Sequence, residues 1–429
     1  MFRGAPVALP WVLAHLAPLL LGAPIAAQVT SPDALALGLG GPSPSLARGF
    51  AAISANPAAL GSADSPSWSV SGLAFEIRRG LDPVTLGDLA NWDGRDIPRT
   101  VRAAWLDDVR RSGSESGGAG LDLTLVSLSL GRLGFQLSAR AAGDVSLNPD
   151  AVELLLFGNA GLTGEPRDYE LAGSAGDGFV VTTGSLAYGL PVAVVDGGSL
   201  HLGATASISL GHALWVARDN GSGLTGDPTR LDLRFPILHV DGNVGSGGEG
   251  LGFAVDLGAL WTRGPLSLGA TVHNALNTFS WDLDDLVLRP GSAFFDPGRS
   301  TTDFDERPGS EAPPVMLDAL EDMTFPLVLA AGAAYRLRPK LTVTGDMVFG
   351  PGGGMAVDSD LRVGIGAEYT PRPDVPLTGG VAILERGVQL SAGVGLKTGR
   401  LSVSSAAAVR TGSLDDAILG SLGVAFHPR

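Results

Sequence analysis

The sequence contains no cysteine, which excludes a disulfide framework and any metal site built from thiolates. Beyond its N-terminus it has no stretch of about 18 consecutive apolar residues, the length that a membrane-spanning helix requires. Only 17% of its residues are charged, and acidic residues outnumber basic ones to give a formal net charge of −15. This charge disfavours nucleic acid as a partner and disfavours docking to anionic lipid through a basic patch.

Motifs for catalysis and cofactor binding are equally scarce. None of the six histidines stands in the H-E-x-x-H spacing of a zinc site, and no G-x-S-x-G nucleophile motif appears. The glycine-rich run at 350–354 lacks the Lys and Ser or Thr of a phosphate-binding loop. Acidic clusters at 282–285 and 303–306 offer carboxylates suited to Ca²⁺, but without EF-hand spacing we interpret them as solvated loop charge. We therefore expect no enzymatic activity, no metal and no cofactor.

The N-terminal segment, residues 1–27, has the organisation of a secretory signal peptide. Arg3 is followed by a mostly apolar stretch and then by small residues that end at Ala27. An anchor helix is the alternative, but Pro10, Pro18 and Pro24 weaken it. We expect export through a signal that is cleaved after Ala27, and because no cysteine follows, the product is not a lipoprotein.

The rest of the chain is dominated by a period of two. Side chains of a strand point alternately to opposite faces, so each such segment has one apolar face and one small or polar face. Three segments show this clearly, at 200–210, 361–369 and 388–396. Further segments of about ten residues begin near these residues: Ser67, Leu121, Leu133, Phe179, Leu231, Leu251, Leu266, Leu327, Leu341, Leu377, Leu401 and Ile418. With one more strand around Tyr169, the pattern predicts about 14 strands, within a range of 14–16.

The composition of the second face separates a membrane barrel from a soluble β-sandwich. A sandwich exposes many Lys, Glu and Thr, whereas here Gly and Ser prevail, and glycine reaches 62 residues. Such a face suits a narrow or plugged lumen, while the apolar face suits lipid. We predict an all-β fold, a transmembrane antiparallel β-barrel over residues 67–429, in the bacterial outer membrane with membrane lipids as its surroundings.

The connections between the predicted strands alternate in length. Short turns at 131–132, 263–265, 338–340, 370–376 and 398–400 alternate with longer connections at 80–118, 148–178, 277–325 and 350–360. Outer-membrane barrels have short periplasmic turns and long outer loops, so both termini are expected in the periplasm, with 277–325 as the long extracellular loop. Pro98–Arg111 and Pro149–Phe157 look helical and either cap the barrel or gate it.

Residues 34–61, ALALGLGGPSPSLARGFAAISANPAALG, resemble the N-terminal signature of the FadL-like outer-membrane superfamily, which includes PorV-type and TraF-type members. That signature ends in Asn-Pro-Ala-Gly-Leu, and here Ala59 replaces its glycine. The runs 250–261 and 266–281 are similar to a PorV-type strand pair. The resemblance implies a barrel of about 14 strands whose N-terminal segment, residues 28–66, folds into the lumen as a hatch.

The resemblance also implies one of two activities. FadL moves long-chain fatty acids and similar apolar molecules inward, whereas PorV-type members are partners of a secretion apparatus. We take passage of hydrophobic small molecules across the outer membrane as the leading function. A non-enzymatic partner of a secretion or surface-export apparatus, or a structural surface barrel, is the alternative.

Two groups of candidate residues follow. The hatch motif comprises Asn56, Pro57, Ala58 and Leu60: Pro57 restricts Asn56 to extended conformations, and the Asn56 side chain can bond nearby backbone. A plain turn before the first strand is the alternative for this segment. The second group comprises polar residues expected on the lumen face: His201, Asp256, His273, Arg362 and Glu368.

A closed barrel predicts heat-modifiable migration on a detergent gel. Because every strand edge is paired, the folded protein should resist detergent and change its apparent size only after boiling. A soluble monomer whose band does not shift on boiling would contradict the architecture.

Overall fold

The computed structural model describes residues 33–41, 43–240, 249–350, 355, 361–385, 387–412 and 417–428. The predicted signal peptide and its cleavage after Ala27 lie outside these ranges, as do residues 28–32 of the predicted hatch. Within them, no helix is both long enough and apolar enough to cross a membrane.

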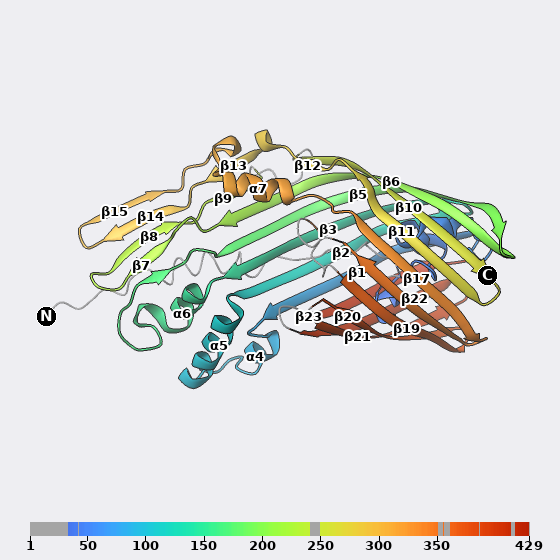
Figure 1. The fold of residues 1–429 in the computed structure, drawn as a ribbon, viewed down its shortest axis with the longest axis horizontal. Helices are drawn as coiled ribbons and strands as arrows, with labels where there is room; N and C mark the ends of the chain where they lie inside the picture. The colour runs from blue at the N-terminus through green and yellow to red at the C-terminus, as the bar shows by residue number, and fades with distance from the viewer. Residues whose placement is uncertain are drawn as a thin grey trace.

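Fourteen antiparallel strands form a closed barrel, in which each strand pairs with its neighbours along the chain and β1 pairs with β23 (Figure 1). The predicted fold class and strand number are therefore confirmed. The strands are β1 (Trp68–Asp82), β2 (Glu115–Leu130), β3 (Leu133–Leu147), β5 (Ala175–Val195), β6 (Gly198–Arg218), β10 (Gly250–Arg263), β11 (Leu266–Asn277), β17 (Val328–Arg338), β18 (Leu341–Phe349), β19 (Leu361–Arg372), β20 (Val375–Leu384), β21 (Gly387–Thr398), β22 (Leu401–Gly412) and β23 (Ala417–Phe426).

The outer face of this barrel is apolar. In β19, Ile365 is 66% exposed, whereas Arg362 on the opposite face is only 4% exposed. The same alternation holds in β6, where Ile208 faces outward and Ser209 is buried. Exposed Leu, Ile, Val and Phe side chains recur around the wall, which is the surface that lipid covers in a transmembrane barrel.

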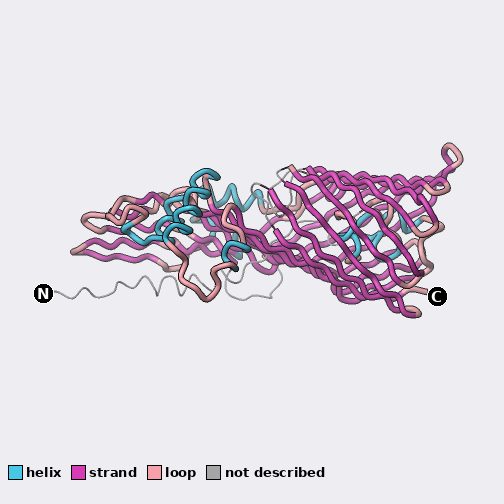
Figure 2. Tube along the Cα trace, turned by 90° about the horizontal axis from the view of Figure 1, so that it is seen from below, coloured by secondary structure: helices cyan, strands magenta, loops and turns pink. Residues whose placement is uncertain are grey.

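A compact segment at the N-terminus lies inside the barrel (Figure 2). It consists of α2 (Leu35–Gly38), η1 (Gly49–Ala51), α3 (Ala52–Ala55) and η2 (Pro57–Gly61). We call residues 33–41 and 43–61 of this segment the hatch. Its interior is apolar: Ile53, Ala58 and Leu60 are buried with Ala187 and Leu260 of the wall in one cluster.

Several strands are longer than the predicted ten residues. β5 and β6 each contain 21 residues, and together with β1–β3 they extend beyond the barrel, so that they carry an outer domain at the end opposite the short turns (Figure 1). The predicted strands were too short because alternation alone does not reveal where a strand leaves the bilayer. We call this end of the molecule the ectodomain.

Two of the predicted barrel strands belong to the ectodomain instead. Leu231 begins no barrel strand, because β8 lies in a separate five-stranded sheet, and the strand at Tyr169 belongs to that same sheet. The sheet has the order β15-β14-β8-β7-β4. Its strands are β4 (Tyr169–Glu170), β7 (Gly223–Thr225), β8 (Arg230–Arg234), β14 (Ser292–Asp296) and β15 (Arg299–Asp303).

The predicted long loop, 277–325, is largely structured. Its strands β12, β13 and β16, together with β9, extend the barrel sheet outward, and α7 packs over them. Phe279, Trp281 and Met316 are buried here against Phe179 and Leu214 of the barrel strands. The elements are β9 (Ile237–Val240), β12 (Ser280–Trp281), η4 (Leu283–Asp285), β13 (Leu286–Arg289), β16 (Arg307–Pro308), η5 (Gly309–Glu311) and α7 (Pro314–Asp322).

Both predicted helical segments are helices of the ectodomain. α5 (Arg99–Ser112) and α6 (Pro149–Phe157) pack together, with α4 (Leu86–Ala90) before them and η3 (Gly158–Ala160) after them. Asn148 caps α6 by accepting a hydrogen bond from the Ala151 N–H at 2.7 Å, and Pro149 occupies the first turn.

A buried carboxylate joins these helices. The Glu153 side chain is 2% exposed and lies 2.6 Å from Arg110 of α5 and 2.6 Å from Arg167. The Leu162 N–H donates to it at 2.8 Å. Burial raises the pKa of Glu153, but the Leu162 hydrogen bond and the charges of Arg167 and Arg110 outweigh that effect and hold the pKa below its ordinary value.

Replacing Glu153 should loosen the helix pair and remove its response to acid. Because the pKa is lowered by folding, the carboxylate stabilises the fold above its unfolded pKa, near 4.5, and this stability is lost as the pH falls through the folded value. We expect Glu153→Gln to lower the local free energy of unfolding by about 1–3 kcal/mol at pH 7. Hydrogen exchange of α5 and α6 measures this change. The exposed Glu165→Gln variant is the control, and equal exchange in the two variants would refute the argument.

Candidate functional site: the hatch in the lumen

Asn56 is the centre of the hatch. Its backbone is extended, with φ −166° and ψ 99°, as expected before Pro57, and its side-chain oxygen accepts from the Ala58 N–H at 3.1 Å. Its side-chain nitrogen donates to two carbonyls, Pro44 O at 2.8 Å and Ala259 O at 2.9 Å. One fully buried amide therefore holds two parts of the hatch together and attaches them to β10.

The rest of the hatch motif packs in the same place. The helix η2 contains the buried residues Pro57, Ala58 and Leu60. It contacts β5, β6 and β10. The wall approaches them closely because it carries glycine. A Cβ at Gly258 would stand 2.3 Å from the Asn56 side-chain oxygen, and one at Gly203 would stand 2.4 Å from the Ala58 nitrogen. A Cβ added to glycines of other strands would come similarly close to atoms of the hatch. Four such glycines are Gly189, Gly269, Gly366 and Gly380.

Hydroxyl groups of the wall satisfy the hatch backbone. Thr205 of β6 donates to Ile53 O and Thr271 of β11 donates to Ala55 O, each at 2.9 Å. Ser69 of β1 accepts from the Phe50 N–H at 2.8 Å. Ser127 and Ser421 donate to the carbonyls of Phe50 and Ala34. Since a backbone group buried without a partner is costly, these bonds define where the hatch sits.

Two polar contacts bind the first part of the hatch to the wall at β18 and β19. The Ser43 hydroxyl donates to Asp346 at 2.9 Å, and the Arg362 guanidinium donates to Gly40 O at 2.8 Å. Arg362 is one of the predicted lumen residues. The hatch covers it, so it is only 4% exposed. Hatch contacts thus extend to every strand of the barrel.

Asp256 and His273, which were predicted on the lumen face, meet at an irregularity of the wall. The register of β10 and β11 shifts between Val255 and Leu257, so that Asp256 alone opposes residues 273–275. The Asp256 carboxylate accepts from the Asn274 N–H at 2.7 Å and lies 3.3 Å from His273 Nδ1. Asn274 has φ 53°, a left-handed conformation that Asn tolerates better than most residues.

This bulge also ends the pairing of β11 with β17, whose last partners are His273 and Val328. Beyond it, Asn274 donates to Pro326 O and Asn277 donates to Phe325 O, both at 2.8 Å. Side chains, rather than a backbone ladder, close the wall here.

The other two predicted lumen residues lie apart from this bulge. Glu368 is half-buried in β19, opposite Thr342 and Thr378, and it has the same orientation as Arg362. His201 of β6 is 4% exposed and lies at the end of the barrel that carries the short turns, beside Gly61 of the hatch.

Between the hatch and the ectodomain the lumen face carries charge. Arg140 and Asp122 form an ion pair at 2.8 Å across β3 and β2, and Arg410 donates to Gln389 at 2.9 Å across β22 and β21. Sequence reasoning did not select these residues, although Asp122 and Arg140 occupy polar positions of alternating strands. It also missed the hydroxyl and glycine contacts, because only the register decides which of many Ser and Gly residues face the hatch. In the described part of the chain, no group of three or more His, Asp or Glu residues is arranged to hold a metal ion.

Comparison with solved structures identifies the fold. The structure is similar to the P. putida toluene transporter TodX, with a TM-score of 0.51 and 12% identity over 93% of this chain and 99% of that one. It is also similar to the Ralstonia pickettii toluene transporter TbuX, with a TM-score of 0.53 and 14% identity over 94% and 100% of the two chains. The chain has a FadL-type barrel fold. No protein-family model and no curated protein matches the sequence.

The likeness extends over nearly the whole length of both transporters. The resemblance noted in the sequence is thereby confirmed at the level of the fold. Neither structure bears on the PorV-type or TraF-type branch.

Removing the Asn56 amide should release the hatch without opening the barrel. Asn56→Ala deletes three hydrogen bonds, including the two amide donations to the Pro44 and Ala259 carbonyls, at an expected cost of about 1–3 kcal/mol to hatch docking. Faster hydrogen exchange over residues 43–61 would show this, while heat-modifiable migration stays unchanged. The exposed Asp64→Ala variant is the control, and unaltered exchange in Asn56→Ala would show that the amide does not secure the hatch.

Proposed function

We propose that the protein lets hydrophobic small molecules pass across the bacterial outer membrane. The observation that carries the proposal is a closed, 14-stranded FadL-type barrel whose lumen is occupied by a hatch bonded to the wall. TodX and TbuX, which share this fold, are toluene transporters. The exported location rests on the predicted signal peptide and on the apolar outer face.

The chemistry of the hatch contacts supports a movable plug. Its docking uses single hydrogen bonds to small hydroxyls, a few buried polar pairs and close van der Waals contact with glycines, with no covalent link in a chain that has no cysteine. Each hydrogen bond contributes only about 0.5–1.5 kcal/mol net. Such a segment can be displaced, and passage along the lumen requires its displacement.

No part of the proposal needs a catalytic step, a metal or a cofactor. The alternative of a secretion-apparatus partner has no structural relative among those described above in its favour. It predicts a stable protein complex and no dependence of solute uptake on the hatch, so the experiment below also tests it.

Covalent locking of the hatch should stop uptake. The Ser43 hydroxyl donates to the Asp346 carboxylate at 2.9 Å, so Ser43→Cys with Asp346→Cys puts thiols on two facing side chains, and oxidation, verified by mass spectrometry, joins the hatch to β18. Because the native chain has no cysteine, this bond is the only one that can form. Uptake of radiolabelled toluene and of a long-chain fatty acid is measured in cells that lack their own hydrophobic-compound channel.

We expect the oxidised double variant to lose uptake and the reduced variant to regain it. The matched control is Thr183→Cys with Ser209→Cys, whose hydroxyls lie 2.8 Å apart and whose disulfide would join β5 to β6 without holding the hatch. Equal uptake by the oxidised and reduced hatch variants would refute passage through the hatch. No uptake of either solute by the unmodified protein would refute the proposed function.

A further inference from the structure

Basic side chains gather at the end of the barrel that carries the short turns. Five of the six short turns place an exposed Arg or Lys there. We call six of these residues the basic belt: Arg132, Arg263, Arg338, Lys340, Arg372 and Arg400. Lys340 donates to the Pro371 carbonyl at 2.7 Å, but none of the six forms an ion pair with another described residue.

The charges of this protein are segregated along its long axis, with the ectodomain at one end and the short turns at the other (Figure 1). Most of the 44 acidic residues lie in segments of the ectodomain: 82–115, 144–177, 219–232 and 282–322. At the short-turn end, the exposed carboxylates of the described chain are those of Asp64, Asp196 and Asp374. The net charge of −15 disfavours a basic patch on the molecule as a whole, and it conceals the belt at this end.

Aromatic side chains mark the depth of the belt in the membrane. Tyr188, Tyr335, Tyr369 and Phe426 are exposed on the outer wall. Each stands opposite the first residue of a neighbouring strand, and these partners are Leu133, Leu266, Leu341 and Leu401. Aromatic residues concentrate at the membrane–water interfaces of transmembrane barrels, so this ring places the interface at the start of β3, β11, β18 and β22.

The belt begins where this aromatic ring ends. Arg132, Lys340 and Arg400 each directly precede one of the four leucines, and Arg263 precedes Leu266 across a tight turn. The belt therefore lies just outside the hydrocarbon, at the depth of lipid headgroups. Long Arg and Lys side chains can extend to that level, and a guanidinium matches the geometry of a phosphate with two parallel hydrogen bonds.

Two other cations at this end lie close to the hatch and are not part of the belt. Arg336 interacts electrostatically with Arg48, and Lys397 interacts with Asp33. The sixth short turn, in the β5–β6 hairpin, carries Asp196 instead of a cation.

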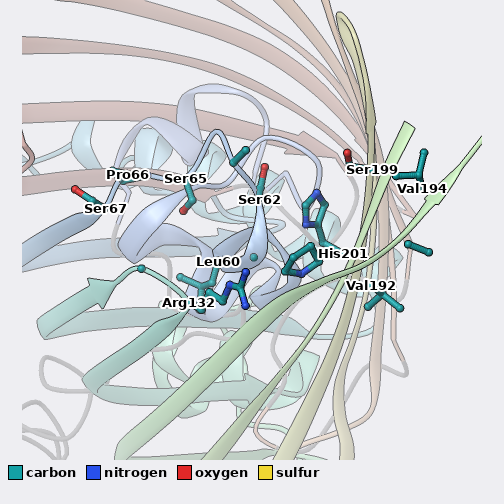
Figure 3. Close-up of a pocket in the computed structure, with 15 residues that line it drawn as sticks. Leu60, Ser62, Ser65, Pro66, Ser67, Arg132, Val192, Val194, Ser199 and His201 are labelled. Carbon is teal, nitrogen blue, oxygen red and sulfur yellow. The ribbon is translucent and has the colours of Figure 1, made fainter. Parts of the chain in front are cut away.

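That hairpin interrupts the belt. It continues beyond Tyr188 to Val195, past the last residue that pairs with β3. A cavity of about 650 Å³ separates it from the turn at Arg132 (Figure 3). Figure 3 shows Arg132 on one side of this space and Val192 and Val194 of the hairpin on the other.

We propose that the basic belt binds the phosphate groups of anionic phospholipids in the leaflet on the short-turn side. The belt residues come from five turns spread around the barrel, so the belt follows the boundary with lipid, whereas a protein partner would meet one side of it. Their positive charge complements that of anionic headgroups, and they lie beside the wall that lipid already covers. The proposal goes beyond the proposed function, since it does not depend on what passes through the lumen.

The test uses the full-length protein in phosphatidylcholine vesicles that contain a trace of spin-labelled phosphatidylglycerol or spin-labelled phosphatidylcholine. The motionally restricted part of the electron paramagnetic resonance spectrum measures the lipid at the barrel wall. We expect phosphatidylglycerol to be preferred by about twofold to fivefold, because one cation near an anionic headgroup corresponds to about fivefold and lipid away from the belt dilutes the effect. Raising the salt from about 0.01 M to about 1 M shortens the Debye length from about 30 Å to about 3 Å, and should reduce the preference towards one.

A variant with four belt charges removed shows whether the belt is responsible. Arg132→Gln, Arg263→Gln, Lys340→Gln and Arg400→Gln are combined, and the preference should fall close to one. The matched control removes four exposed charges from the ectodomain by Arg95→Gln, Arg111→Gln, Arg230→Gln and Arg299→Gln, and it should keep the preference. A third variant with Arg132→Lys, Arg263→Lys and Arg400→Lys retains the charge and should keep most of the preference.

Heat-modifiable migration verifies that each variant is folded. If the four-charge belt variant does not fold, its two halves, Arg132 with Arg263 and Lys340 with Arg400, are measured separately, and each should lose part of the preference. An equal loss in the belt and ectodomain variants would overturn the proposal, because the preference would then follow net charge. Absence of any preference in the unmodified protein, or a preference that neither salt nor the belt substitutions reduce, would also overturn it.

Discussion

The pairing of β1 with β23 is the constraint on which the rest of the structure depends. A sheet that spans a bilayer must leave no backbone N–H or C=O unpaired in hydrocarbon, and only closure achieves this. Closure then creates two environments from one period-two pattern. Side chains such as Ile365 meet lipid, and their neighbours on the strand, such as Arg362, turn into an enclosed lumen.

The enclosed lumen imposes a second requirement on the hatch that fills it. Its short helical turns leave many backbone groups without partners of their own, and these must be paired inside the barrel. The wall meets this need with hydroxyls, such as Thr205 and Thr271, and approaches closely where it has glycine, as at Gly203 and Gly258. The high glycine content of the chain is thus partly a property of the fit between wall and hatch.

The outer and inner ends of the lumen differ in chemistry. Towards the ectodomain the wall carries paired charges, among them Asp122 with Arg140, which suit a hydrated space. At the opposite end the cavity beside His201 is lined by apolar side chains, serines and Arg132. The hatch separates these two spaces.

Local sequence determined the architecture of this protein. Alternation over 200–210 and 361–369 predicted strands with one lipid face, short turns such as Gly131–Arg132 predicted the common end of the hairpins, and Asn56-Pro57 predicted an extended, side-chain-bonded turn. These features depend on neighbours within a few residues, which is why they can be read without a structure. The helix at Pro149–Phe157 was predictable for the same reason, through its Asn cap and first-turn proline.

Tertiary structure alone decided which of these residues meet. Leu231 has the pattern of a barrel strand, yet its partners across the register are Leu224 and Phe295 of the ectodomain sheet. Asp256 and His273 were both expected in the lumen, but only the shifted register of β10 and β11 brings them together at a bulge. A one-residue change of register exchanges the two faces of a strand, and no local signal specifies that choice. The long-range pairing of fourteen strands therefore decided the contacts of the hatch and the position of His201 beside Gly61 at one end of the barrel.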